Sequence, residues 1–410
     1  MDQTGIGNWR IRVGGLVLVF GILTYLPWML ANLNTQALWL ALPFAFANLL
    51  LAANALATAI NNWQRSSPPP RDVPRGAEPV VVVLIPTYGE PAWMVERTAE
   101  SVLQQDWPPD KVRLIIGDDA HAPAIAEVAA RLSARYPAVP LLYHEPPRHG
   151  SPDRPGDAKA GNLNSALALA YAHWPDLDFV ETRDADDEVG DPQFLRRCVG
   201  ELLSDRRIAY VQTIKDARVS PGDPFGNREL NFYRGLMLGK HAANAVFPCG
   251  SGLVWRGAAL EDIGRFPTWN LVEDLHSGIE ALRRGWRSAY VPIIGALAQH
   301  APEDIPNVYK QRGTWAIDTI RLLLWHRMRG LNARQRLHFL EMGLFYLYGF
   351  SAIGNLLSQV ITLFFGVYPV RFAGDSYGLR FWVYALGIEI FLWLLRGTLP
   401  YASLWRMRQV

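Results

Sequence analysis

Long stretches of this chain carry no charge, and this constrains its fold more than any other feature of the sequence. The range Val13–Gln64 contains no Asp, Glu, Lys or Arg, and Met342–Val370 is also uncharged. A helix needs about 20 mainly apolar residues to cross a bilayer. The first stretch is therefore long enough for two spans with a turn near Asn32–Gln36, and the second for one. A third stretch, Phe381–Leu395, has a single Glu and predicts a shorter fourth span.

Arginines around these stretches predict their orientation, because cytosolic loops of membrane proteins are enriched in Lys and Arg. The connection inside the first hairpin has none. The arginines that flank the spans are Arg10, Arg12, Arg65, Arg71 and Arg75 for the first pair, and Arg327, Arg329, Arg334, Arg336, Arg406 and Arg408 for the later ones. We therefore expect a multi-pass protein of the inner (plasma) membrane, with both termini and the large middle segment in the cytosol and the lipid bilayer as a partner.

Composition narrows the class further. Half of the residues are hydrophobic, which is too many for an ordinary soluble protein, while 19% are charged, which is too many for an all-membrane one. The net charge of +2 gives no argument for nucleic acid as a partner. Cys198 and Cys249 lie far apart in a segment expected in the cytosol, so they imply neither a disulfide nor a metal cluster.

The middle segment alternates apolar runs with helical patterns. The expected strands are Val80–Ile85, Val112–Ile116, Leu141–Tyr143 and Leu177–Glu181, and the expected helices are Trp93–Gln104, Ile125–Arg135, Asn162–His173 and, later, Leu275–Arg283. This alternation predicts an α/β domain with a parallel sheet and helices on both faces. Ligands of such sheets bind beyond the carboxyl ends of the strands.

Acidic residues follow two of these strands. Asp118-Asp119 comes after the second strand, and Asp184-Ala185-Asp186 after the fourth. On an extended backbone, carboxylates two residues apart point to the same side. Such a pair can hold Mg²⁺ or Mn²⁺, which usually bridges to a substrate phosphate. The alternative is a pair of acidic turns with solvated charges.

Two further segments join them. Val272-Glu273-Asp274 precedes a helix, where its charges alternatively serve only to favour the helix dipole. Gln311-Arg312-Gly313-Thr314-Trp315 precedes an expected amphipathic helix, Trp315–Met328, and its Trp is alternatively an anchor at the membrane interface. That helix fits the membrane surface or, equally, a buried core position. Gln335–Leu347 is expected to form a second such helix.

Together these segments resemble family 2 glycosyltransferases of the GT-A (Rossmann-like) fold, specifically the membrane-embedded, processive cellulose synthase branch. The resemblance runs from about Val80 to Val370. It also rests on three supporting segments, Pro86–Pro91, Lys159–Asn164 and Phe247–Gly252, in this order between membrane hairpins. It implies a cytosolic GT-A domain inserted between transmembrane helices.

The resemblance also implies an activity. We expect an inverting transferase that polymerises a β-linked polysaccharide from a UDP-sugar, with UDP-glucose the expected donor, and that helps to translocate it. A growing polysaccharide would be the acceptor, and synthase subunits or further copies of the chain would be partners. The alternatives are single transfer of a sugar to a lipid carrier and an inactive scaffold within a synthase complex.

The resemblance assigns roles residue by residue. Asp274 is expected to be the general base, beside Glu273 in the catalytic segment. Asp184 and Asp186 would bind Mg²⁺ or Mn²⁺ and the nucleotide, with Asp186 the more direct ligand. The other expected substrate-binding residues are Asp118 or Asp119 for the uridine, Lys159 for the diphosphate (alternatively a surface lysine), Phe247, Cys249 and Gly250 around the acceptor sugar, Trp315 stacked under it, and Thr87, Tyr88, Glu90, Gln311 and Arg312.

One position departs from the family. The last motif of the family is Gln-X-X-Arg-Trp, and here Thr314 stands where the arginine belongs. That arginine would face the donor diphosphate, so a cation is missing. Arg183 is a candidate to offset the loss, and its alternative role is a salt bridge with Glu181 or Asp187.

These patterns divide the chain into five parts. They are an N-terminal transmembrane hairpin (1–64), a linker (65–78), the cytosolic GT-A domain (79–313), amphipathic interface helices (314–347) and C-terminal transmembrane helices (348–410).

Overall fold

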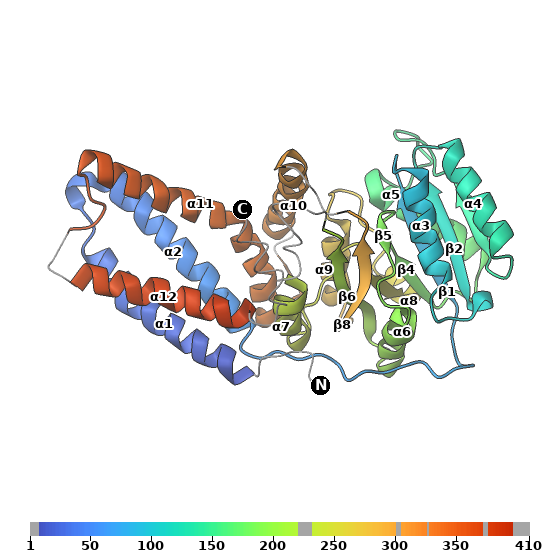
Figure 1. Cartoon of the computed structure of the whole chain (residues 1–410), viewed down its shortest axis with the longest axis horizontal. Coiled ribbons are helices and arrows are strands. Elements are labelled where there is room, and N and C mark those ends of the chain that lie inside the picture. The colour runs from blue at the N-terminus through green and yellow to red at the C-terminus, as the bar shows by residue number, and fades with distance from the viewer. Residues whose placement is uncertain (1–7, 220–231, 301–304, 326–327, 372–375, 397–410) are drawn as a thin grey trace. The chain divides into compact units, whose positions relative to one another are not determined.

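The computed structural model describes residues 8–219, 232–300, 305–325, 328–371 and 376–396. The chain divides into two compact units, drawn in Figure 1. The described part of one unit is formed by residues 8–65, 332–371 and 376–396, and that of the other by residues 66–219, 232–300, 305–325 and 328–331. Three of the arginines used for orientation, Arg327, Arg406 and Arg408, lie outside the described residues.

The first unit is helical. Its elements are α1 (Asn8–Ala31), the short η1 (Thr35–Ala37), α2 (Leu38–Asn61), α11 (Ala333–Phe365) and α12 (Ser376–Arg396). Helix α1 packs on α12, and α2 packs on α11. In the described part of the chain, four helices are long and apolar enough to cross a membrane: those of residues 8–31, 35–61, 333–365 and 376–395. These match the four expected spans in place.

Small and polar residues bring these helices together. A Cβ at Gly21 would lie 2.9 Å from the backbone of Tyr384, so only glycine permits this approach of α1 to α12. Asn48 of α2 donates a hydrogen bond to Asn355 of α11. The capping box of Asn332 and Gln335 begins α11. The stretch Gln335–Leu347 is therefore the first part of one long helix and not a separate interface helix.

Among its described residues, the second unit contains a mixed sheet of eight strands. They are β1 (Val81–Thr87), β2 (Val112–Asp118), β3 (Leu141–His144), β4 (Phe179–Thr182), β5 (Asp187–Glu188), β6 (Ile208–Ala217), β7 (Leu253–Arg256) and β8 (Arg287–Ala298). Their order across the sheet is β3-β2-β1-β4-β7-β6-β8-β5. The four strands expected from the sequence are β1 to β4, and they run parallel.

The expectation of a wholly parallel sheet is wrong for the other half. Strand β7 is antiparallel to both β4 and β6, and β5 is antiparallel to β8. The physical reason is that a strand buried on both faces reads as a continuous apolar run whichever way it is directed. The side chains of a short buried strand such as β7 carry no sign of its direction, and only the pairing partner decides it.

Helices cover the sheet on both faces. Those that contact its strands are α3 (Ala92–Leu103), α4 (Pro123–Arg135), α5 (Ala158–His173), α6 (Phe194–Ser204), α7 (Met237–Ala242), α8 (Gly257–Asp262) and α9 (Glu273–Arg283). The unit also contains α10 (Ile305–Trp325) and the short turns η2 (Pro109–Lys111) and η3 (Phe232–Leu236). Helices α3, α4 and α6 share one core with Val81, Val83 and Ile85 of β1. Helix α5 contacts β1 and β2. Each fully buried Val, Leu or Ile contributes roughly 1.5–3 kcal/mol.

Two helix boundaries bear on the site. Helix α5 begins at Ala158, four residues before the expected start, so Lys159 lies in its first turn. Helix α10 begins at Ile305, so residues 311–315 lie inside a helix and do not precede one. In α10, Leu322 is buried while Ile317 and Leu324 are 61% and 65% exposed. One side of this helix therefore packs on the protein, and an apolar strip remains uncovered in this structure.

Candidate active site

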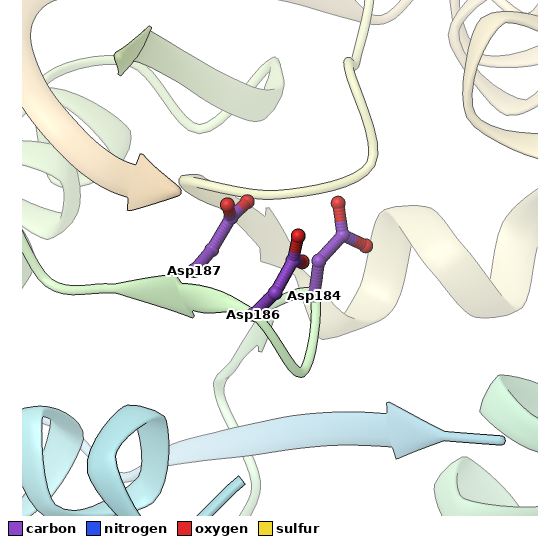
Figure 2. A group of neighbouring side chains, drawn as sticks. All are labelled: Asp184, Asp186 and Asp187. Carbon is purple, nitrogen blue, oxygen red and sulfur yellow. The ribbon is translucent and has the colours of Figure 1, made fainter. Parts of the chain in front are cut away.

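Three carboxylates meet where β4 ends. Oxygen atoms of Asp184, Asp186 and Asp187 all lie within 4.8 Å of one another (Figure 2). The backbone here is a turn and not an extended strand, and the N–H of Asp187 donates to the carbonyl of Asp184. The two residues expected as metal ligands are thus brought together by a turn. Asp187 was missed from the sequence, although the acidic run from 184 to 188 could have pointed to it.

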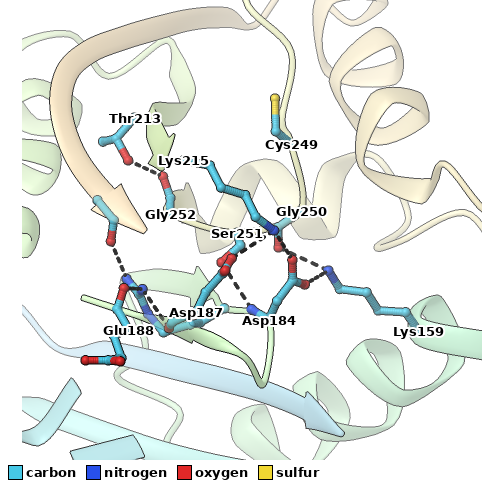
Figure 3. Close-up of polar contacts among 12 residues, drawn as sticks. Lys159, Asp184, Asp187, Glu188, Thr213, Lys215, Cys249, Gly250, Ser251 and Gly252 are labelled. Carbon is cyan, nitrogen blue, oxygen red and sulfur yellow. Dashed lines mark hydrogen bonds and ion pairs between the residues drawn. The ribbon is translucent and has the colours of Figure 1, made fainter. Parts of the chain in front are cut away.

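Two lysines neutralise this cluster (Figure 3). The ammonium of Lys159, from the first turn of α5, contacts Oδ1 of Asp184. The ammonium of Lys215, from the end of β6, lies 2.6 Å from Oδ2 of Asp184 and 2.9 Å from Oδ2 of Asp187. Lys159 is therefore not an ordinary surface lysine. Lys215 was not predicted, and a lone lysine late in a strand gives little signal in sequence.

The buried charges shift the titration of the cluster. Burial alone would raise the pKa of Asp184, but the ammonium groups of Lys159 and Lys215 outweigh it and hold that pKa below its usual range. Burial, together with the neighbouring charge of Asp187, raises the pKa of Asp186 to about 7. Asp184 is therefore ionised at neutral pH, and Asp186 loses its proton more easily when further positive charge is near.

The cluster fits a divalent cation. Both oxygens of the Asp187 carboxylate are buried, and among the described residues neither accepts a hydrogen bond of good geometry. Carboxylate oxygens are the ligands that Mg²⁺ and Mn²⁺ prefer. Asp184, Asp186 and Asp187 would hold such an ion, and the ion would supply positive charge for a leaving diphosphate.

The second acidic pair stands close to the first. Glu273 begins α9, and its Oε1 lies 3.9 Å from Nζ of Lys159. Burial raises the pKa of Glu273 to about 7, and it also raises the pKa of Asp274. A Cβ at Gly250 would lie 3.0 Å from Nζ of Lys159 and 3.4 Å from Oδ2 of Asp274. Gly250, which adopts φ +75°, therefore leaves the space where these two side chains face each other.

The segment around Gly250 is held by a buried glutamine. Gln212 of β6 accepts a hydrogen bond from the N–H of Cys249 at 2.7 Å and donates to the carbonyls of Ser251 and Gly252. Phe247 is buried, and the thiol of Cys249 is half-buried. The three expected acceptor residues thus lie on one loop fixed through its backbone. Gln212 is a further residue that the sequence did not single out.

Asp118 and Asp119 lie at the carboxyl end of β2, next to the end of β1, because Asp118 pairs with Thr87. The carboxylate of Asp118 is fully buried and accepts hydrogen bonds from the N–H groups of Ala120 and Ala122. Asp119 forms a two-point pair with Arg154 at 2.9 and 3.0 Å. Asp118 therefore organises its own loop, Asp119 ties that loop to the segment before α5, and the contact of either with a uridine stays a prediction.

The loop after β1 is built around Glu90. Its carboxylate accepts hydrogen bonds from the hydroxyl of Thr87 and the N–H of Tyr88, both at 2.6 Å. Tyr88 is 70% exposed. Thr87 and Glu90 thus shape this loop, and Tyr88 presents an aromatic face to solvent.

Helix α10 carries the last group of expected residues. Gln311 is exposed, and the guanidinium of Arg312 lies over the ring of Trp315, 5.9 Å from its centre. The hydroxyl of Thr314 donates to the carbonyl of Lys310 in the same helix. Asp318 accepts a hydrogen bond from the N–H of Leu271, which ties α10 to the loop before α9.

Arg183 does not offset the missing cation. Its side chain is fully buried, and its Nε–H donates to Oε1 of Glu181 at 2.5 Å. Its other N–H groups donate to the carbonyls of Asp187, Glu188 and Gly295. The salt bridge with Glu181, the structural alternative, is therefore the role that the structure supports. A buried, paired guanidinium has no route to a ligand.

Comparison with known families identifies the family and the fold of this chain. Residues 78–317, more than half of the chain, match the family described as Glycosyltransferase like family 2. The chain belongs to this family. A solved archaeal member of the fold, a mannosyltransferase from Pyrobaculum calidifontis in complex with GDP-mannose and Mn²⁺, superimposes with a TM-score of 0.59 at 18% identity, over 87% of this chain and 99% of that one. This family 2 glycosyltransferase therefore has a GT-A-like fold.

Curated relatives of this glycosyltransferase are bacterial cellulose synthases. Cellulose synthase 1 of Komagataeibacter xylinus is 32% identical over 368 residues, which are 84% of this chain and 22% of that protein. The UDP-forming catalytic subunit of cellulose synthase 1 from the same organism is 33% identical over 70% of this chain and 37% of its own length. That of Pseudomonas fluorescens is 28% identical over 87% and 48%. The chain thus spans less than half the length of these relatives.

Proposed function

We propose that this glycosyltransferase extends a β-linked glucan at the membrane, taking sugars from UDP-glucose with inversion at the anomeric carbon. The observation that carries the proposal is the meeting of two acidic groups around Lys159. On one side lie Asp184, Asp186 and Asp187, and on the other Glu273 and Asp274. The likeness to UDP-forming cellulose synthases supports the donor and the product.

The reaction needs a base and a neutralised leaving group. Asp274 accepts the proton of the acceptor hydroxyl, whose oxygen then bonds to the anomeric carbon as the carbon–oxygen bond to the diphosphate breaks. The electron pair of that bond leaves with UDP. Lys159 stabilises the charge that develops on the diphosphate. One base without a nucleophilic carboxylate gives one displacement, so an α-linked donor yields a β-linked product.

The acceptor is held beside this base. The loop of Phe247, Cys249 and Gly250 borders the sugar, and Trp315 stacks under it, because aromatic faces suit the apolar faces of sugars and fix the two reactants in line. Gln311 and Arg312 lie in the same helix as Trp315. Thr87, Tyr88 and Glu90, with Asp119, form the nucleoside side of the pocket.

The membrane is part of the proposal. The four apolar helices anchor the chain in the inner membrane with the α/β unit in the cytosol, and they contribute to the path of the product. The exposed apolar strip of Ile317 and Leu324 on α10 lies on the membrane surface. Synthase subunits or a second copy complete the assembly.

The test is product formation by the purified chain in lipid nanodiscs with radiolabelled UDP-glucose and Mg²⁺ or Mn²⁺. We expect a polymer that a β-1,4-glucanase degrades. A single labelled sugar that extracts with lipid would favour transfer to a lipid carrier, and no transfer from any UDP-sugar would favour a scaffold. Either result would overturn the proposal.

The base assignment has its own test. Asp274→Asn removes the proton acceptor, so turnover should fall by about 10²- to 10⁴-fold while UDP still binds. Asp176→Asn, at an exposed carboxylate in the turn before β4 and so at the other end of that strand from the cluster, is the matched control and should leave turnover unchanged. Unchanged turnover in Asp274→Asn contradicts the assignment.

A further inference from the structure

Lys215 occupies a position that no expected role explains. It lies on β6, and its Nζ bridges Oδ2 of Asp184 and Oδ2 of Asp187 at 2.6 and 2.9 Å (Figure 3). Its side chain is 28% exposed, so the residue is not enclosed in the core as Arg183 is.

The motif that residues 311–315 resemble carries an arginine where this chain has Thr314, and the resemblance implies that this arginine faces the donor diphosphate. Thr314 stands at that position, and its hydroxyl is turned to the carbonyl of Lys310 in its own helix. Arg183, the nearest arginine in sequence to the acidic cluster, is fully buried and paired with Glu181. Neither residue brings positive charge to the donor.

Lys159 does not fill the gap by itself. Its Nζ contacts Asp184 and also donates to the carbonyl of Gly250 at 3.2 Å, with Glu273 at 3.9 Å. It is thus held between the two acidic groups, on the side of the base. Lys215 contacts Asp184 through the other oxygen and reaches Asp187 instead. The two lysines therefore stand on different sides of the same carboxylate.

The oxygens that hold Lys215 are those that a divalent ion needs. Asp184 and Asp187 are two of the three residues whose carboxylates converge. An ammonium and a divalent ion on the same oxygens oppose each other, because the two cations repel and compete for the same lone pairs. The four-carbon stem of lysine is flexible, so its charge can move to a nearby anion without a backbone change.

We propose that Lys215 exchanges between two partners. It pairs with Asp184 and Asp187 when no divalent ion is bound, and it pairs with the donor diphosphate when an ion occupies the cluster, so that it supplies the cation absent at Thr314. The inference rests on the proposed function, since it names a donor-binding residue of that same site. It does not depend on which sugar the donor carries.

The test measures binding, with Mn²⁺ and UDP as the probes and the full chain in nanodiscs. In Lys215→Met, Mn²⁺ alone should bind more tightly than in the unaltered chain, because its competitor is gone; electron paramagnetic resonance of free Mn²⁺ measures this. UDP at saturating Mn²⁺ should bind about tenfold more weakly, the size expected for a lost charge-assisted hydrogen bond, as measured by calorimetry. Equal or weaker Mn²⁺ binding overturns the exchange, and unchanged UDP binding overturns the diphosphate contact.

Three further variants separate the charge of Lys215 from other effects of the substitution. Lys215→Arg keeps the charge and should keep UDP affinity within a few-fold. Lys111→Met, at the opposite end of β2 from the site, should change neither affinity. Adding Thr314→Arg to Lys215→Met should restore UDP binding; no restoration, with Lys215→Arg normal, would overturn the claim that Lys215 replaces the cation at 314.

A second variant distinguishes a loss of UDP binding from a failure of the protein to fold. Should Lys215→Met fail to fold because Asp187 is left unpaired, Lys215→Gln removes the charge but keeps an amide that can donate a hydrogen bond to that carboxylate, and it tests UDP binding with all three aspartates in place. Both readouts are independent of turnover. An unaltered chain that binds Mn²⁺ and UDP as expected but transfers no sugar would overturn the proposed function and leave this inference standing.

Discussion

At the scale of single residues, two cations beside the acidic cluster have opposite fates. Arg183 and Lys215 both contact the segment from 184 to 188, yet Arg183 is fully buried and satisfied by Glu181 and three backbone carbonyls. It also lies over the ring of Phe194. Lys215 keeps part of its side chain in solvent. The difference between a structural cation and one that can reach a ligand is therefore the burial of its side chain, which cannot be read from the sequence.

Arg183→Met should destabilise the α/β unit. It leaves the Glu181 carboxylate buried without its partner, which costs about 3–5 kcal/mol. We expect a lower melting temperature in detergent, and the double variant Arg183→Met with Glu181→Met should recover most of the loss because no unpaired charge remains. Arg207→Met, on an exposed arginine, is the control and should leave the melting temperature nearly unchanged. A melting temperature unchanged in Arg183→Met would contradict the structural role.

Gly250→Ala should impair turnover more than stability. The new Cβ would press on Nζ of Lys159 at 3.0 Å and face Oδ2 of Asp274 at 3.4 Å. We expect at least a tenfold fall in turnover as these groups move, since a shift of about 1 Å can cost 10²-fold. Gly264→Ala is the matched control: it has a similar φ, +81°, with nothing within 4 Å of the new Cβ. Equal turnover in both variants would mean that the space at Gly250 is unimportant.

At the scale of elements, the site is assembled by strand ends and by loops fixed through their backbones. The ends of β1 and β2 lie in register, as the sequence predicted for parallel strands. The antiparallel strand β7 and the end of β6 bring in the 247–252 loop and Lys215, neither of which a simple parallel sheet would have placed there. The positions of Lys215 and of the 247–252 loop thus depend on strands β6 and β7, whose directions the sequence did not reveal.

Gln212→Glu tests how this loop is held. The new carboxylate still accepts from the N–H of Cys249 but can no longer donate to the carbonyls of Ser251 and Gly252. The carbonyls of Ser251 and Gly252 then lose their buried hydrogen-bond donor, and each buried polar group left without a partner lowers the free energy of unfolding by about 1–3 kcal/mol. We expect a lower melting temperature and a higher KM for the acceptor, measured with short glucan primers. Gln193→Glu, at the exposed start of α6, should change neither.

At the scale of the whole molecule, the chain joins a helical unit to an α/β unit. The uncharged ranges of the sequence predicted the four long apolar helices in number and place, because length and charge are the properties that a bilayer selects. The sequence predicted a division between interface helices and spans after residue 347. No helix ends there, because α11 runs without interruption from Ala333 to Phe365. Charged residues at its start did not end the helix, because a capped, solvent-facing turn tolerates them.

Membrane orientation can be measured directly. Gln36→Cys places a thiol in the exposed connection between α1 and α2, and the positive-inside pattern predicts that this connection lies outside the cytosol. A membrane-impermeant maleimide should label it in intact cells. A variant with an exposed thiol in the α/β unit, Asp176→Cys, should react only after permeabilisation. Labelling of Asp176→Cys in intact cells would place the α/β unit on the other side.

The sequence by itself determined the features that depend on local composition and on short patterns. These are the four apolar helices, the strands β1 to β4, and the acidic groups at 184–186 and 273–274. The spacing of apolar residues, the length of a segment and its residue types can all be read from neighbouring positions in the chain. The tertiary structure alone decided which charges pair. It enclosed Arg183, paired Asp118 with its own loop and Asp119 with Arg154, added Asp187 to the cluster, and set Lys215 between two aspartates. Charge pairing acts over a few ångströms between segments far apart in the chain, so only the folded backbone can settle it.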